Sequence, residues 1–270
     1  RVHLRSYAAL LLGIGLWLSV PTAVRAAECM GEPAPPATES GIHAPLDGLL
    51  RAFVHDGVVD YGCLQAHEAQ LDTYLRVVAR IDPSVLSRDR QIALWINAYN
   101  AFTLKLILSR YPAIASIKEI PRRWEREEWV VGGRRYSLDA IEHEILRREF
   151  HEPRIHFAIV CASKSCPDLA AEAYLAARLD EQLDRAARGL LADSRKGARV
   201  AREKGLLGDV HNKLYLSAIF KWFREDFARG GSLVDFVKGY LPADARTFVD
   251  VAGGDLALDF LDYDWTLNGE

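Results

Sequence analysis

The pattern of apolar and polar positions predicts a chain of short helices arranged around one long helix. Residues 88–110 are apolar over most of a helical circumference, and Pro112 follows directly, so we expect a helix that is buried on nearly all sides. Apolar residues at helical spacing predict further helices over residues 45–53, 63–80, 138–148, 179–191, 217–227 and 233–241.

Strand signals are fewer and shorter. Residues 128–131 and 134–136 flank Gly132-Gly133, a pair that accepts the positive φ angles of a two-residue hairpin turn. An alternating, β-prone run over 154–162 predicts a strand that carries Cys161 at its end. The remaining expected strands lie at 57–61, near Val200, at 213–216 and at 256–263. The fold class is therefore α+β: a helix-dominated single domain with a small, mainly antiparallel sheet.

The first residues have the order of a secretory signal. Arg1 and Arg5 precede an apolar run over 7–20, which is followed by small residues up to Ala27. The run is shorter than the roughly 20 residues that cross a bilayer. We expect a signal peptide over 1–26, a flexible leader rich in Pro and small residues over 27–45, one globular domain over 46–268, and a periplasmic or secreted location. An uncleaved anchor and lipid attachment at Cys29 are lesser alternatives.

Charge and cysteine content narrow the possible partners. The chain has 34 Lys and Arg against 37 Asp and Glu, a net charge of -3, so it lacks the basic field of a nucleic-acid-binding protein. No segment after the signal is apolar enough to predict a stable membrane span. After export the four cysteines would meet an oxidising environment, so a disulfide is an open alternative for each of Cys29, Cys63, Cys161 and Cys166.

The segment Cys161-Ala-Ser-Lys-Ser-Cys166-Pro167 is the main chemical candidate. A thiol at a strand end, followed by a small polar turn, lies near backbone N–H groups that can stabilise a thiolate or an oxyanion. The alternatives are a Cys161–Cys166 disulfide and a zinc site, although the spacing lacks a second ligand pair. We expect no metal and no cofactor. Thiol–disulfide exchange ranks last, because the spacing is not Cys-x-x-Cys.

Two histidines and two asparagines accompany this thiol. His143 lies at the edge of the apolar face of its helix and is available as a general base, with a structural or solvated histidine as the alternative. His156 lies near the start of the expected strand, on the opposite side of the pleat from Cys161, which predicts a core or ladder-edge histidine. Asn97 and Asn100 share one face of the buried helix and must be hydrogen-bonded. They either tie a neighbouring loop to the helix, or orient a base or bind a substrate carbonyl.

Four segments together resemble the domain of unknown function 547 family, over roughly residues 47–267. They are Trp95-Ile-Asn-Ala-Tyr-Asn-Ala101, Ile141-Glu-His-Glu-Ile-Leu-Arg147, His156 to Pro167, and Ile219 to Phe227. The resemblance brings no settled activity, and fusions of some members to a glutaredoxin-like domain hint at thiol chemistry. It implies that Cys161 is the more regular thiol, while the position of Cys166 can be serine. Within these motifs we expect four residues to contact a ligand: Glu142, His156, Ser165 and Cys166.

Two functions follow as hypotheses. In the first, a thiol-dependent hydrolase or acyl transferase with a cysteine-peptidase-like arrangement uses Cys161 as the nucleophile and His143 as the base, oriented by Asn97 or Asn100. It requires Cys161 and His143 within about 3 to 4 Å of each other. In the second, a non-catalytic envelope domain with a Cys161–Cys166 disulfide binds a peptide, glycan or protein.

Overall fold

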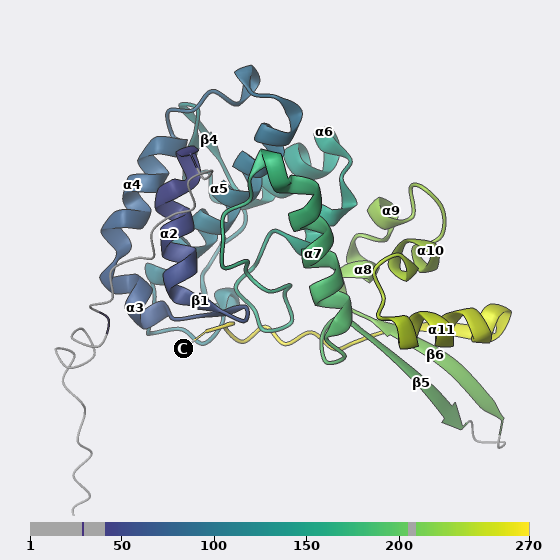
Figure 1. Cartoon of the computed structure of the whole chain (residues 1–270). Coiled ribbons are helices and arrows are strands. Elements are labelled where there is room, and N and C mark those ends of the chain that lie inside the picture. The colour runs from purple at the N-terminus through teal and green to yellow at the C-terminus, as the bar shows by residue number, and fades with distance from the viewer. Residues whose placement is uncertain (1–28, 30–40, 205–208, 270) are drawn as a thin grey trace, which may run out of the picture.

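The longest helix, α5 (Arg88–Leu108), is buried continuously from Ile92 to Leu104, as the sequence predicts. It belongs to a computed structural model that describes Cys29, residues 41–204 and residues 209–269. The helices α2 (Ala44–Phe53) and α4 (Glu68–Val78) pack as neighbours, and α4 packs against α5 (Figure 1). Among the described residues, no helix combines the length and the apolar character that crossing a membrane requires.

The segment before α4 is more divided than its pattern predicts. The expected strand at 57–61 is reduced to β2 (Val58–Val59), which pairs antiparallel with β1 (Val54–His55). The expected helix at 63–80 is α3 (Tyr61–Ala66) followed by α4, with His67 between them. The expected signal peptide and most of the expected leader lie outside the described residues. The end of that leader is helical, because η1 (Gly41–His43) leads directly into α2.

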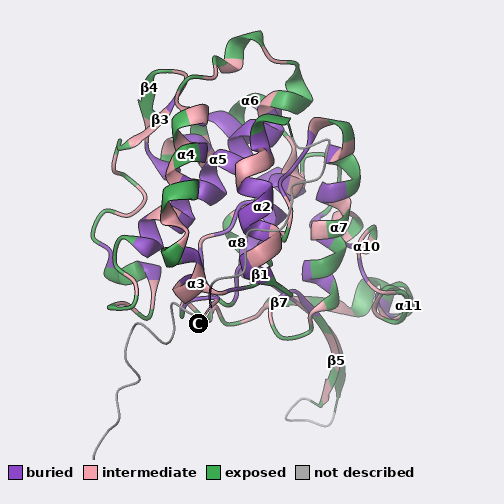
Figure 2. Ribbon diagram, turned by 60° about the vertical axis from the view of Figure 1, so that its left-hand side comes forward, coloured by how far each residue is buried: buried purple, intermediate pink, exposed green. Residues whose placement is uncertain are grey.

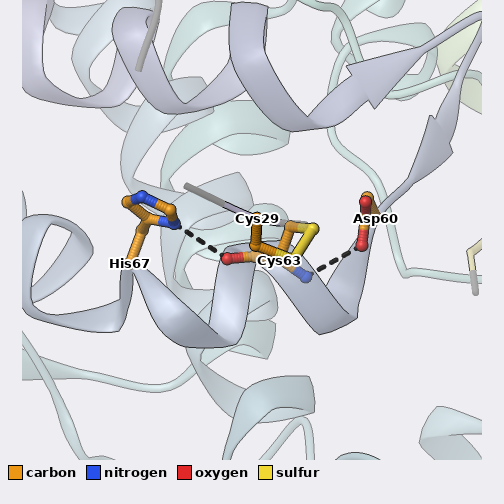
Figure 3. Close-up of a disulfide and its surroundings, with 4 residues drawn as sticks. All are labelled: Cys29, Asp60, Cys63 and His67. Atoms are coloured by element: carbon orange, nitrogen blue, oxygen red, sulfur yellow. Dashed lines mark hydrogen bonds between the residues drawn. A yellow bond between two sulfur atoms is a disulfide. The ribbon is translucent and has the colours of Figure 1, made fainter. Parts of the chain in front are cut away.

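A disulfide between Cys29 and Cys63 ties a residue of the expected leader to α3 (Figure 3). Two hydrogen bonds fix Cys63: its N–H donates to Asp60 Oδ1 over 2.8 Å, and its carbonyl oxygen lies 2.9 Å from His67 Nδ1. The sequence left pairing open for all four cysteines. Here Cys29 pairs with Cys63, whereas Cys161 and Cys166 are free thiols.

The hairpin after α5 is formed as predicted. Strand β3 (Trp129–Val131) pairs antiparallel with β4 (Arg134–Tyr136), and Val131 faces Arg134 across the turn. Gly132 and Gly133 have φ angles of 56° and 78°, which a residue with a Cβ adopts rarely. Between α4 and α5 lies η2 (Pro83–Val85), and between α5 and β3 lies η3 (Ile117–Glu119).

The predicted helix over 138–148 is mainly a π-helix. It is η4 (Ala140–Arg147), followed by the short α6 (Arg148–Phe150). Ser137 caps the start of this helix, because its hydroxyl accepts a hydrogen bond from the Ala140 N–H over 3.0 Å. A π-helix has a wider turn than an α-helix, is rare, and frequently occurs at functional sites. The spacing of apolar residues predicted a helix here but not this type.

The strand predicted over 154–162 is wrong. The chain forms the 3-10 helix η5 (Pro153–Phe157), which Glu152 caps by accepting from the Arg154 N–H, and it then continues without strand pairing up to Cys161. Residues 155–160 are all buried, so the apolar run reflects burial on every side and not a pleat. His156 and Cys161 therefore do not lie on opposite faces of a strand.

The second half of the chain carries a three-stranded sheet. β5 (Ala198–Lys204) pairs antiparallel with β6 (Val210–Leu216), and β7 (Leu256–Phe260) joins β6 in parallel. Around it lie η6 (Ala176–Arg178), α7 (Leu179–Ala192), α8 (Ile219–Trp222), α9 (Arg224–Phe227), α10 (Leu233–Lys238), α11 (Ala243–Ala252) and η7 (Gly253–Asp255). The helix predicted over 217–227 is interrupted at Phe223, and α11 was not predicted.

Two apolar clusters form the core of this α+β domain. One surrounds α5 and contains most buried residues up to Leu183, and the other joins α7, the three-stranded sheet and α8 to α11. Figure 2 shows the buried stretches on α5, α2 and α7. Ile155 and Ala158 belong to the first cluster and Phe157 to the second, so the segment before Cys161 lies where the two meet. The helix-dominated α+β class with small sheets is confirmed.

Candidate functional site

Cys161 lies in a pocket of about 190 Å³ where residues of both clusters meet. The residues that line the pocket belong mainly to α5, η4, the segment around Cys161, α8 and the segment after β7. They comprise Tyr99, Trp124, Asp139, Glu142, His143, His156, Ile159, Cys161, Cys166, Pro167, Ile219, Trp222, Phe223, Tyr263 and Trp265.

The half-buried thiol of Cys161 is surrounded by hydrogen-bond donors. Its Sγ lies 2.8 Å from Cys166 Sγ, 3.1 Å from Ser163 Oγ and 3.3 Å from Tyr263 Oη. The hydrogen bond from Cys166 is the main influence that lowers the pKa of Cys161 to about 7, against the opposing effect of burial. Burial raises the pKa of Cys166, so Cys166 keeps its proton and donates it toward Cys161. The arrangement favours a thiolate at Cys161 near neutral pH.

Asn100 fixes the backbone that leads to this thiol. Its Nδ2 donates to the Ala158 carbonyl over 2.9 Å, and its Oδ1 accepts from the Val160 N–H over 2.9 Å. Asn97 binds Tyr174 in the same way, at 2.8 and 2.9 Å. Both amides thus tie neighbouring segments to α5, which is one of the two roles that the sequence left open. A direct catalytic role for either stays a prediction.

His143 shares the pocket with Cys161, but its ring is engaged elsewhere. Nδ1 accepts from Arg147 Nη1 over 2.8 Å, and Nε2 lies 3.4 Å from Asp139 Oδ1. Among the described residues, no hydrogen bond joins His143 to Cys161. The structure therefore brings the two predicted partners into one cavity without pairing them, and the role of His143 as the base stays a prediction.

Glu142 supplies a carboxyl group to the same pocket. Tyr99 Oη donates to Glu142 Oε2 over 3.1 Å, which fixes the carboxyl between α5 and η4. Burial raises the pKa of Glu142, and the charge of Cys161 raises it further, while His143 lowers it. Glu142 thus interacts electrostatically with the candidate nucleophile and retains its proton to higher pH than an exposed glutamate.

His156 is a buried member of an ion-pair network. Its Nε2 lies 2.8 Å from Asp226 Oδ2, which also accepts from Arg147 Nε over 2.6 Å. The imidazole stacks on Phe223 with 4.0 Å between ring centroids. Burial lowers the pKa of His156, whereas hydrogen bonds from His156 and Arg147 outweigh burial and depress that of Asp226. The lowered pKa favours the neutral imidazole of His156, which lines the pocket.

The segment after β7 runs back along the thiol loop. The Lys164 N–H donates to the Thr266 carbonyl over 2.8 Å, the Ser165 N–H donates to the Asp264 carbonyl, and the Asp264 N–H donates to Ser165 Oγ. Figure 1 shows this segment passing beneath the molecule from the sheet toward β1. Ser165 therefore holds the segment in place and lines a second cavity on its other side. Ala162, directly after Cys161, has a φ of 60°, so the loop turns sharply there.

Sequence reasoning missed the residues that this segment brings to the thiol. Tyr263 and Trp265 line the pocket although they lie about 100 residues further along the chain. Sequence reasoning also missed Ser163, which contacts the thiol from within the thiol loop itself. The segment Asp262-Tyr-Asp-Trp265 has no helical periodicity, so no local pattern marked Tyr263 and Trp265 as part of the site. Among the described residues, no group of three or more His, Cys, Asp or Glu could hold a metal ion.

The fold and the site define a helix-dominated α+β domain with two adjacent free thiols in an aromatic pocket. Residues 83–191 match the family described as "Protein of unknown function, DUF547". The matched range runs from η2 into α7 and includes Asn97, Asn100, His143, His156 and Cys161. This match confirms the resemblance that the motifs predicted. Searches of curated proteins and of solved structures found no match.

Proposed function

We propose that the protein is a thiol-dependent hydrolase or acyl transferase with Cys161 as its nucleophile. The observation that carries this proposal is the environment of the Cys161 sulfur. The hydrogen bond from Cys166 lowers the pKa of Cys161 to about 7, within a pocket large enough for a small group of a substrate. A thiolate available at neutral pH is what covalent catalysis by cysteine requires.

The proposed reaction uses Glu142 as the proton donor. The Cys161 thiolate attacks an acyl carbon, a carbon–sulfur bond forms, and the bond to the leaving group breaks as Glu142 gives that group its proton. Water, or an acceptor in a transferase, then attacks the thioester, loses its proton to Glu142 and releases the Cys161 thiolate. The raised pKa of Glu142 supports this order. His143, held by Asp139 and Arg147 in the same pocket, is the alternative base.

The first test is alkylation of the purified protein with iodoacetamide across pH, with the labelled cysteine mapped by mass spectrometry. Labelling at Cys161 with an apparent pKa near 7, well below the roughly 8.5 of a free thiol, supports the proposal. Cys161→Ser is the control that must lose this labelling. Absence of labelling until a reductant is added would show that Cys161 is locked in a disulfide. The enzyme proposal would then give way to a non-catalytic domain that binds a peptide, glycan or protein.

A second candidate function is thiol–disulfide exchange, which the 2.8 Å distance between the sulfurs of Cys161 and Cys166 favours. The Cys161 thiolate would attack a substrate disulfide, and Cys166 would then resolve the mixed disulfide, leaving a Cys161–Cys166 bond and a reduced substrate. An external dithiol would have to restore the two thiols. Cys166→Ser separates the two functions, because it traps a mixed disulfide in exchange but still permits acyl transfer.

We further propose that the protein acts in the periplasm or outside the cell, after removal of residues 1–26. The order of residues at the start of the chain supports export, and the Cys29–Cys63 disulfide is a bond that persists in oxidising compartments. Cell fractionation with mass measurement of the mature chain tests this. A cytoplasmic protein that keeps its first residues would contradict it.

A further inference from the structure

An aromatic wall lies beside the candidate nucleophile. The rings of Trp222, Tyr263 and Trp265 lie in mutual contact, with 4.6 to 5.8 Å between their centroids. Trp222 is 47% exposed, although indole rings are ordinarily well covered. Tyr263 also contacts the Cys161 sulfur, so the wall begins at the reacting atom. A substrate held at Cys161 would therefore lie against these rings.

The acidic and basic residues around this pocket are distributed unevenly. Asp139 and Glu142 line it, whereas its walls, within the described parts of the chain, include no Lys or Arg. Arg147 lies on the same helix as Glu142, but its guanidinium bonds Asp226 and His143. Asp139 and the Cys161 thiolate supply negative charge, whereas Glu142 keeps its proton more readily, so the pocket attracts cations and repels anions.

The wall already holds one ammonium group. Lys118 Nζ lies over the Trp265 ring at 4.9 Å from its centroid, within the range of a cation–π contact. Lys118 does not line the pocket, and the rings of Trp222 and Tyr263 carry no such partner among the cation–π contacts of the described residues. Of these two residues, Tyr263 contacts the Cys161 sulfur directly.

We propose that this wall, together with Glu142 and Asp139, binds the cationic side chain of a lysine or arginine in a peptide substrate whose carbonyl lies at Cys161. The proposal rests on the thiol-dependent function given above and names its substrate class. Ring faces attract a cation, the Asp139 carboxylate neutralises it, and the Glu142 carboxyl can accept a hydrogen bond from it. An acidic peptide meets repulsion from the same groups, and a neutral sugar would stack on the rings without using the carboxylates.

The test measures binding to the full chain carrying Cys161→Ser, which cannot turn substrate over. The probes are three blocked pentapeptides that differ at the central residue: lysine, its uncharged isostere norleucine, or glutamate. Titration calorimetry is expected to give a dissociation constant about tenfold lower for the lysine peptide than for the norleucine peptide. Trp222→Leu and Asp139→Asn, the latter at the start of the π-helix η4, are each expected to reduce that ratio.

Glu144→Gln is the matched control, because Glu144 is an exposed carboxylate on the same π-helix and lies outside the pocket. It should leave the ratio unchanged. Equal binding of the lysine and norleucine peptides, no binding of any peptide, or an equal effect of Glu144→Gln would overturn the proposal. Because binding is measured without the thiol, a charge preference in a protein whose Cys161 proves unreactive would refute the enzyme while leaving the binding site intact.

Discussion

Asn100 holds the N–H of Val160, the residue before Cys161, and the carbonyl of Ala158 two residues earlier. This single amide, on a helix buried on all sides, sets the path of the backbone into the candidate site. Asn97, one turn earlier, binds the backbone N–H and carbonyl of Tyr174 in the same way, on a segment that follows the thiol loop in sequence. Asn97 and Asn100 thus make the same pair of hydrogen bonds, but Asn100 positions the segment before Cys161 and Asn97 positions the segment at Tyr174.

That match gives the first prediction. Asn100→Ala and Asn97→Ala each leave two buried backbone groups unpaired, so each should lower the free energy of unfolding by about 2 to 4 kcal/mol. Urea denaturation measures this loss. Asn100→Ala alone should also slow iodoacetamide labelling of Cys161 under native conditions, because the sulfur leaves its donors. Equal labelling rates in the two variants would contradict the positioning role of Asn100.

The second prediction concerns Cys166. Its hydrogen bond is the leading cause of the low pKa of Cys161, so Cys166→Ala should raise that pKa toward the roughly 8.5 of a free thiol. The thiolate fraction at pH 7, and with it the labelling rate, should fall about tenfold, while the rate at high pH stays nearly the same. A pH profile of labelling measures both limits. An unshifted profile would show that Ser163 and Tyr263 suffice.

Acid should destabilise the fold through His43. Burial lowers the pKa of His43 to about 4, and its Nδ1 lies 2.8 Å from the hydroxyl of buried Tyr74. The unfolded chain, with a histidine pKa of about 6.5, binds the proton more readily. The unfolding free energy should therefore fall as pH drops from 6.5 to 4, by up to about 3 kcal/mol from this group.

The variant that checks this is His43→Asn, whose oxygen can replace Nδ1 beside Tyr74 but does not titrate. Its unfolding free energy should depend less on pH between 6.5 and 4 than that of the wild type. His55→Asn, at an exposed histidine, is the control and should follow the wild-type curve. Parallel curves for all three proteins would rule out His43 as a source of acid sensitivity.

The fourth prediction concerns the Cys29–Cys63 disulfide. The two cysteines are 34 residues apart in sequence, and closing a loop of this length in the unfolded chain stabilises the fold by about 3 to 4 kcal/mol. A variant with both Cys29→Ala and Cys63→Ala should lose stability by this amount in denaturant unfolding. Reductant should destabilise the wild type and leave the double variant unaffected. A double variant as stable as the wild type would mean that the bond contributes nothing to folding.

The predictable parts of this fold are those decided by local chemistry. Gly132 and Gly133 predicted their hairpin because few other residues accept both φ angles, and Pro112 follows α5 as a stop signal should. The run over 154–162 misled because burial on all sides gives an apolar run without revealing its backbone. Instead, the segment begins with Pro153 at the first helical position and Glu152 as its cap, and it forms a 3-10 helix.

The candidate site was predictable in its residues and not in its geometry. Cys161 and Cys166 stood out through their local sequence, yet their adjacency depends on the turn at Ala162, which no periodicity encodes. Tyr263 depends on pairing between segments about 100 residues apart, such as that of Ser163 with Leu267. Contacts of that range are set by tertiary packing, so a local pattern carries no information about them.

The pairing between the thiol loop and the segment after β7 also sets an order of events during synthesis. Tyr263 follows Cys161 by 102 residues. When Cys161 has been synthesised, the growing chain therefore still lacks one of the hydrogen-bond donors to its sulfur and much of the aromatic wall. Until Tyr263 docks, the Cys161 sulfur has Cys166 and Ser163 beside it but lacks the Tyr263 hydroxyl. The complete pocket, with Tyr263 and Trp265 beside the thiol, therefore forms only after the segment beyond β7 has bound the thiol loop.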